Sequence, residues 1–175
     1  MPQLADVLAP WRDFFTLLGE ASATMVALLF VAASVASGVF STDRSAPMRV
    51  FLSASVVHFG SILAACLLMM APFRNEAILG AMIFIAGMFG LGYYAVTWRD
   101  MMRDGLIKRL DLEDRTWYTF LPAATYLMEV ASGYLLISAY PSGVTALAIT
   151  LGLLMLIAIH NAWDITVWSI GRRRD

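Results

Sequence analysis

The chain has 175 residues, of which 60% are hydrophobic and 14% are charged, and its formal net charge is −1. A soluble domain is usually about half apolar and about one quarter charged, so this composition is typical of a membrane protein. The near-neutral charge gives no indication of nucleic-acid binding. The single cysteine, Cys66, has no partner in the chain for a disulfide.

Five apolar stretches follow one another along the chain. Each is at least about 20 residues long, which is enough for a helix to cross a bilayer. Only helices are expected, because the stretches lack the two-residue alternation of barrel strands and a lone strand leaves its backbone unsatisfied in lipid. The sequence therefore predicts an all-α, polytopic, single-domain membrane protein with transmembrane helices at 16–40, 50–70, 77–98, 118–140 and 144–170.

Basic residues lie almost entirely on one side of the predicted membrane. Ten of the twelve Lys and Arg residues fall between the first and second helices, between the third and fourth, and after the fifth. The positive-inside rule places this side in the cytoplasm, so we expect the N-terminus outside and the C-terminus inside. The cytoplasmic segment 99–117 mixes five basic with five acidic residues, and we expect a short salt-bridged helix or hairpin interrupted at Gly105.

Two further patterns concern packing and the membrane surface. Small residues recur three or four positions apart in the first and third helices, which favours close helix contacts within the chain or between copies. Apolar residues at helical spacing near the N-terminus predict a helix that lies along the outer interface: Leu4, Val7, Leu8 and Trp11.

The predicted spans contain a small set of ionisable residues: Glu20, His58, Glu129, His160 and Asp164. Because a charged side chain costs at least about 2.5 kcal/mol at the bilayer centre, such residues usually pair or line a cavity. At 1.5 Å per residue, His58, Glu129 and His160 fall roughly 12–16 Å from the cytoplasmic ends of three different helices. Asp164 is roughly 9 Å deep, and Glu20 lies near the outer edge.

This layer supports the hypothesis of an ion or proton channel or transporter. Histidine titrates near neutral pH, and Glu129 has no interface nearby to solvate it. We expect Glu129 to be the central protonatable group, His160 to be a relay steered by Asp164 four residues later, and His58 to be the opposing partner. Asn161 and Glu20 complete the predicted pathway. Five helices are few for a self-contained carrier, so a homo-oligomer in the lipid bilayer is expected.

Other interpretations stay open. Asp164 can reach the inner interface, Glu20 can pair with Arg12, and His58 can be a packing residue, as in a structural or accessory subunit. A b-type haem held by His58 and His160 is another possibility, as is a transition-metal site of His58, His160, Glu129 and Asp164. An inverted repeat is also suggested, because the first two spans carry Glu20 and His58 and the last two carry Glu129 and His160. No enzyme or cofactor motif is present.

The start of the first helix, Leu17–Ser34, reads LLGEASATMVALLFVAAS. It resembles the first helix of small uncharacterised bacterial inner-membrane proteins, in which Gly, small residues and Thr precede Leu-Phe-Val-Ala and a Ser. The resemblance covers about a tenth of the 175 residues, and Glu20 departs from the small residue expected after Gly19. It implies location in the bacterial inner membrane and no particular mechanism.

Overall fold

The computed structural model describes residues 4–39, 45–73, 75–103 and 112–171. All regular structure within these ranges is helical, as the sequence predicts. The elements in chain order are α1 (Leu4–Leu8), η1 (Ala9–Trp11), α2 (Arg12–Val39), α3 (Ser45–Met70), α4 (Glu76–Arg103), α5 (Leu112–Arg115), the π-helical turn η4 (Thr116–Phe120), α6 (Leu121–Ile137) and α7 (Ser142–Gly171).

Several helices have the length and composition of membrane spans. Among the described residues, four stretches qualify: Asp6–Ser34, Glu76–Arg99, Thr116–Ile137 and Ser142–Asp164. The apolar part of α3 within these residues, Ala54–Met70, is shorter. Large apolar side chains such as Leu28, Phe30 and Phe89 are exposed on the outside of the bundle, where they suit contact with lipid tails. These are the features of an integral membrane protein.

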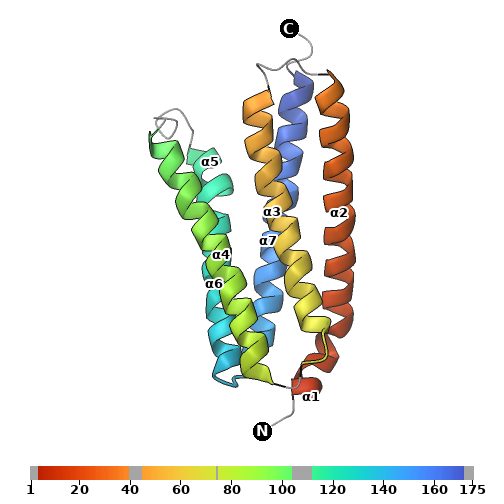
Figure 1. The fold of residues 1–175 in the computed structure, drawn as a ribbon, viewed down its shortest axis with the longest axis vertical. Helices are drawn as coiled ribbons and strands as arrows, with labels where there is room; N and C mark the ends of the chain where they lie inside the picture. The colour runs from red at the N-terminus through yellow and green to blue at the C-terminus, as the bar shows by residue number, and fades with distance from the viewer. Residues whose placement is uncertain (1–3, 40–44, 74, 104–111, 172–175) are drawn as a thin grey trace.

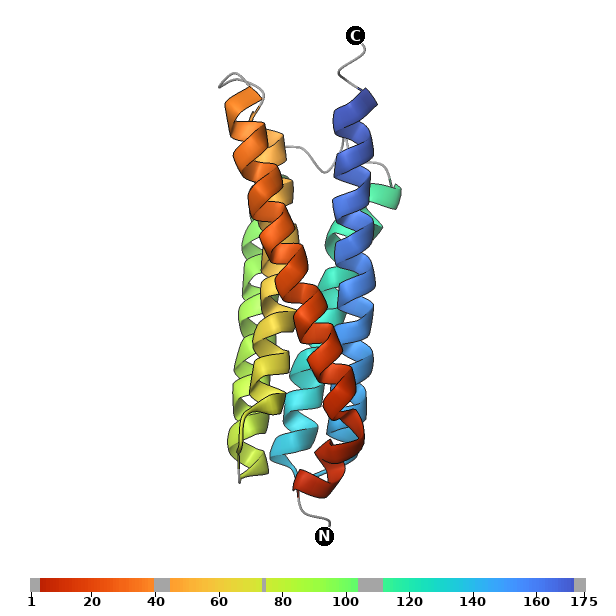
Figure 2. The same cartoon turned by 90° about the vertical axis from the view of Figure 1, so that its right-hand side faces the viewer.

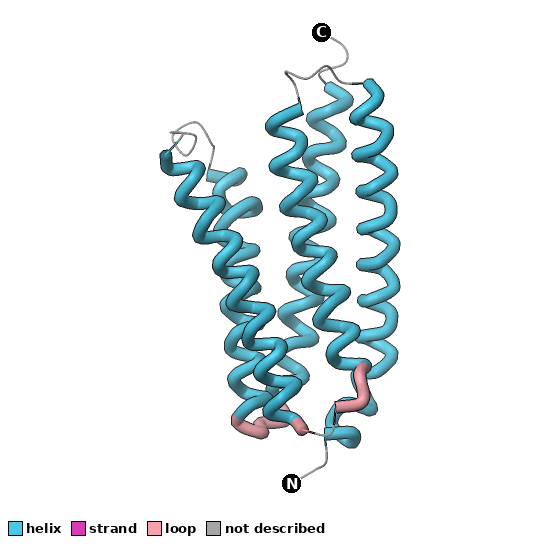
Figure 3. Tube along the Cα trace, in the orientation of Figure 1, coloured by secondary structure: helices cyan, strands magenta, loops and turns pink. Residues whose placement is uncertain are grey.

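The long helices run alternately up and down, so the N-terminus and the C-terminus lie at opposite ends of the bundle (Figure 1). α2 packs on α3, α4 packs on α6, and α7 contacts both α3 and α6. Figure 2 shows α2 crossing obliquely over the bundle. Toward the end at which α7 finishes, the α4–α6 pair diverges from the other three helices (Figure 3). The two helix groups are therefore closest near the end at which the chain begins.

Glycines allow α4 and α6 to approach each other closely. A Cβ atom added at Gly80 would lie 2.6 Å from the backbone nitrogen of Ile137. One added at Gly133 would lie 2.5 Å from the backbone nitrogen of Phe84. The small residues of this pair are thus used for packing within the chain, as close contacts between membrane helices require.

The helix ends differ from the predicted ones in places. α6 ends at Ile137 rather than near Tyr140, because Ala139 adopts a φ of 56° and the chain turns sharply into α7. α4 continues to Arg103, whereas the predicted break at Gly105 lies outside the described residues. At the other end of the bundle, the apolar N-terminal side chains pack against the bundle's own core: Val7, Leu8 and Trp11.

Candidate functional site

A buried hydrogen-bonded cluster is centred on His58 in α3. Its side chain is fully buried, and both ring nitrogens are occupied. The hydroxyl of Tyr94 in α4 lies 2.7 Å from Nε2, and the hydroxyl of Tyr126 in α6 lies 3.1 Å from Nδ1. The imidazole and the Tyr94 ring are nearly parallel, with centroids 5.7 Å apart. His58 therefore joins its own helix to the α4–α6 pair.

The cluster continues from Tyr126 back to α3. The Tyr126 hydroxyl donates a hydrogen bond to Oγ of Ser61, 3.2 Å away. Ser61 lies three residues after His58, which places both on one face of the helix. Gly90 leaves room for the Tyr126 ring, because a Cβ atom there would lie 2.1 Å from ring carbon Cδ1. The result is a continuous chain of hydrogen bonds from Tyr94 through His58 and Tyr126 to Ser61.

Glu129 lies three residues after Tyr126 on the same face of α6. Its side chain is fully buried, and neither carboxyl oxygen has a hydrogen-bond partner among the described residues. The neighbouring hydroxyls of Thr125 and Ser132 donate to backbone carbonyls of their own helix. An ionised carboxylate in this setting would be costly, so the surroundings favour the neutral acid.

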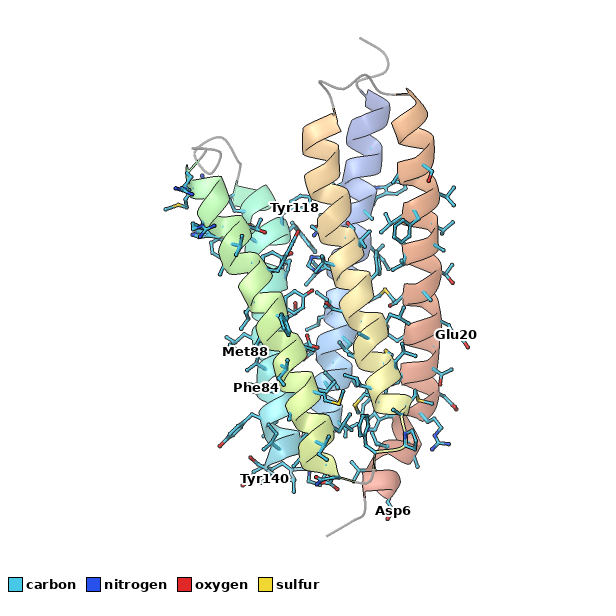
Figure 4. All side chains as sticks on the ribbon, in the orientation of Figure 1. Asp6, Glu20, Phe84, Met88, Tyr118 and Tyr140 are labelled. Carbon is cyan, nitrogen blue, oxygen red and sulfur yellow. The ribbon has the colours of Figure 1, made fainter. Side chains whose placement is uncertain are left out.

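A second cluster connects η4 to α7. The His160 ring stacks on Trp117, with centroids 3.7 Å apart and an interplanar angle of 12°. The hydroxyl of Tyr118, labelled in Figure 4, donates to Oδ2 of Asp164 at 2.7 Å. Nδ2 of Asn161 donates to the Trp117 carbonyl at 3.2 Å. Asp164 is thus bonded to a tyrosine of another helix, whereas the sequence suggested His160 as its partner.

Glu20 lies apart from both clusters. Its side chain is exposed on the outer side of α2 and points away from the bundle (Figure 4). The hydroxyls of Thr16 and Thr24 on the same stripe donate to backbone carbonyls of α2. Glu20 and Glu129, which would correspond in the suggested inverted repeat, therefore occupy opposite environments.

The predicted metal ligands do not gather at one place in the described part of the chain. Within the part of the chain that the structure describes, no three His, Cys, Asp or Glu side chains come together as a metal site. The four predicted ligands all fall in this part: His58, His160, Glu129 and Asp164. Both nitrogens of His58 already bond to tyrosines, so neither is directed at a haem iron in this arrangement.

Sequence reasoning missed the tyrosines that bind His58. Tyr126 lies well inside its predicted span 118–140, and a buried phenol hydroxyl usually has a hydrogen-bond partner, so its position was a usable signal. Tyr94 lies near the end of its predicted span 77–98, where tyrosine is common at the membrane interface. Trp117 gave no such signal, because aromatic residues are common at the ends of membrane helices.

Comparison with known proteins adds no assignment, since no protein-family model, curated protein or solved structure matches the chain.

Proposed function

We propose that the chain is a bacterial inner-membrane protein that conducts protons through the interior of its helix bundle. The observation that carries the proposal is the fully buried carboxyl of Glu129, which has no hydrogen-bond partner among the described residues and lies one helical turn from a hydrogen-bonded chain. That chain consists of a phenol, an imidazole, a second phenol and a hydroxyl: Tyr94, His58, Tyr126 and Ser61. Each of these groups can both release and accept a proton.

The proposal includes five membrane crossings. α3 has 26 residues, and at 1.5 Å per residue it is about 39 Å long, more than the roughly 30 Å of a hydrocarbon core. Termini at opposite ends of the bundle agree with an odd number of crossings. Ten of the twelve Lys and Arg residues lie in the segments that follow α2, α4 and α7 along the chain or at the helix ends next to these segments. We therefore place that end in the cytoplasm and the N-terminus outside.

Protons suit this interior better than hard metal cations. Ca²⁺ takes six to eight oxygen ligands and Mg²⁺ takes six, whereas the hydroxyls beside Glu129 are turned to their own backbone. A proton needs only donors and acceptors within hydrogen-bond distance, which the chain through His58 provides. One water molecule between Tyr126 and Glu129 would complete the path, since water bridges buried polar groups of this kind.

A flux measurement tests the proposal. The purified protein is reconstituted in liposomes that contain a pH-sensitive dye, and a potassium diffusion potential drives proton entry. We expect a flux above that of empty liposomes, and we expect Glu129→Gln to abolish it. Glu20→Gln is the matched control, because it makes the same change on an exposed face of another helix. Wild-type vesicles that leak no faster than empty ones, or full flux in Glu129→Gln, would exclude this pathway.

A structural or accessory subunit is the second candidate. It is favoured by the complete pairing of His58 and by the bond between Tyr118 and Asp164, since such bonds also hold membrane helices together. In that case, the reconstituted protein shows no flux. Chemical cross-linking in native membranes would then identify its partner chains, including further copies of itself.

A further inference from the structure

We propose that the outward face of α2 binds the same face of a second copy of the chain, so that the protein is a parallel dimer in the membrane. Five residues at helical spacing form the outer stripe of this face: Thr16, Glu20, Ala23, Thr24 and Ala27. The proposal needs a chain that spans the membrane, and it does not depend on proton conduction.

The outer stripe is exposed and carries mostly small side chains. All five residues are exposed, whereas Phe15 and Gly19 on the other side of α2 are buried against the bundle. At about 100° of rotation per residue, Leu17 and Leu28 lie on one side of the stripe and Phe30 lies on the other. A strip of small side chains between large ones lets a second membrane helix come close. The glycines of α4, by contrast, already contact α6 within the chain.

The Glu20 carboxyl group makes the outer stripe unsuited to contact with lipid tails alone. Glu20 lies inside the candidate span Asp6–Ser34 and points away from the bundle (Figure 4). Toward the outer end, the nearest charged residues are Asp13 and Arg12, which are about 10–12 Å away along the helix axis. A side chain with two methylene groups does not reach that far, and lipid tails offer a carboxyl group no hydrogen-bond partner. A protein surface with a polar group at the same depth would supply one.

A second copy fits because two identical faces supply what each of them needs. The ten-to-two distribution of Lys and Arg orients every copy in the same direction, so the two α2 helices run parallel. A twofold axis along the membrane normal then places each residue of the outer stripe opposite itself at the same depth. Two neutral Glu20 carboxyls each donate one hydrogen bond and accept one, so the pair buries no charge. Ala23 and Ala27, four residues apart, let the two backbones approach.

Disulfide cross-linking in native membranes tests which face is covered. In a Cys66→Ala background, a single cysteine replaces Ala27 or, as a control, Phe89. Phe89 is 76% exposed on α4, on the other side of the bundle from α2 (Figure 1). We expect mild oxidation to convert Ala27→Cys into a species of twice the monomer mass and to leave Phe89→Cys monomeric. The absence of a dimer with Ala27→Cys, equal dimer from both variants, or an adduct of Ala27→Cys with a different protein would each overturn the proposal.

Resonance energy transfer between labelled copies of the full chain, diluted stepwise with lipid in liposomes, measures how strongly the copies associate. Glu20→Leu removes the carboxyl pair and should weaken association by roughly threefold to thirtyfold, the worth of one hydrogen bond between membrane helices. Glu20→Gln keeps a neutral donor and acceptor at this position and should associate like the wild type. Equal association of Glu20→Leu and the wild type would contradict the role of the carboxyl group.

A pair of alanine substitutions tests the close approach of the two helices. Ala27→Leu places a large side chain on the outer stripe and should lower the energy transfer. Ala21→Leu makes the same change at an exposed position about 100° around α2 from Glu20 and should leave it unchanged. Equal effects of the two substitutions would overturn the proposed face. A dimer without proton flux would overturn only the proposed function, and flux without a dimer would overturn only this inference.

Discussion

A methyl group added at Gly133 tests the close packing of α6 against α4. In Gly133→Ala, the new Cβ atom would lie 2.5 Å from the backbone nitrogen and 2.7 Å from the Cα of Phe84. Ordinary contacts are 3.4–4 Å, so the two backbones must separate by about 1 Å. Overpacking of this kind costs about 1–3 kcal/mol, and backbone atoms cannot rotate out of the way as a side chain can.

Gly92 in α4 provides the matched control. A Cβ atom there meets nothing within 4 Å, so Gly92→Ala should stabilise the helix by about 0.5–1 kcal/mol. Thermal unfolding in detergent, followed by circular dichroism, compares the two variants with the wild type. Opposite shifts of the unfolding temperature are expected. If Gly133→Ala is as stable as Gly92→Ala, α4 and α6 do not approach as closely as described.

Two further outcomes are expected. Glu129→Leu should abolish proton flux and raise the unfolding temperature. The buried carboxyl has no hydrogen-bond partner among the described residues, and burying such an unpaired polar group costs about 1–3 kcal/mol, which the substitution removes. A lower unfolding temperature would mean that the carboxyl is well paired. The topology can be tested in a Cys66→Ala background, with a new cysteine at either end of the chain. A membrane-impermeant maleimide added to intact cells should label Asp6→Cys and spare Asp175→Cys, because we place the N-terminus outside and the C-terminus inside. The reverse labelling would mean that the topology is inverted.

The sequence predicted the helices well because their lengths follow from the apolar runs. It also indicated the burial of Glu129, since this residue lies far from either end of its span. Depth alone, however, does not tell which face of a helix turns inward. Glu20 was placed on the pathway for its position along α2, and its side chain faces outward because α3 covers the opposite face.

The partners of the buried side chains were harder to predict, because they come from other helices. His58 bonds to tyrosines of α4 and α6, which lie 36 and 68 residues away along the chain. Asp164 bonds to Tyr118 only because η4 packs on α7. Spacing within one helix suggested His160 instead, since local periodicity carries no information about which helices meet.

The π-helical turn η4 sets the rotational phase between the two clusters. A π turn contains one more residue than an α turn, and one residue corresponds to about 100° of rotation around the helix axis. Trp117 and Tyr118 lie within this turn and contact α7, while Tyr126 and Glu129 follow it on the same continuous helix. A single-residue deletion in Thr116–Phe120 would therefore swing the aromatic pair off α7 and leave the interior chain around His58 in place.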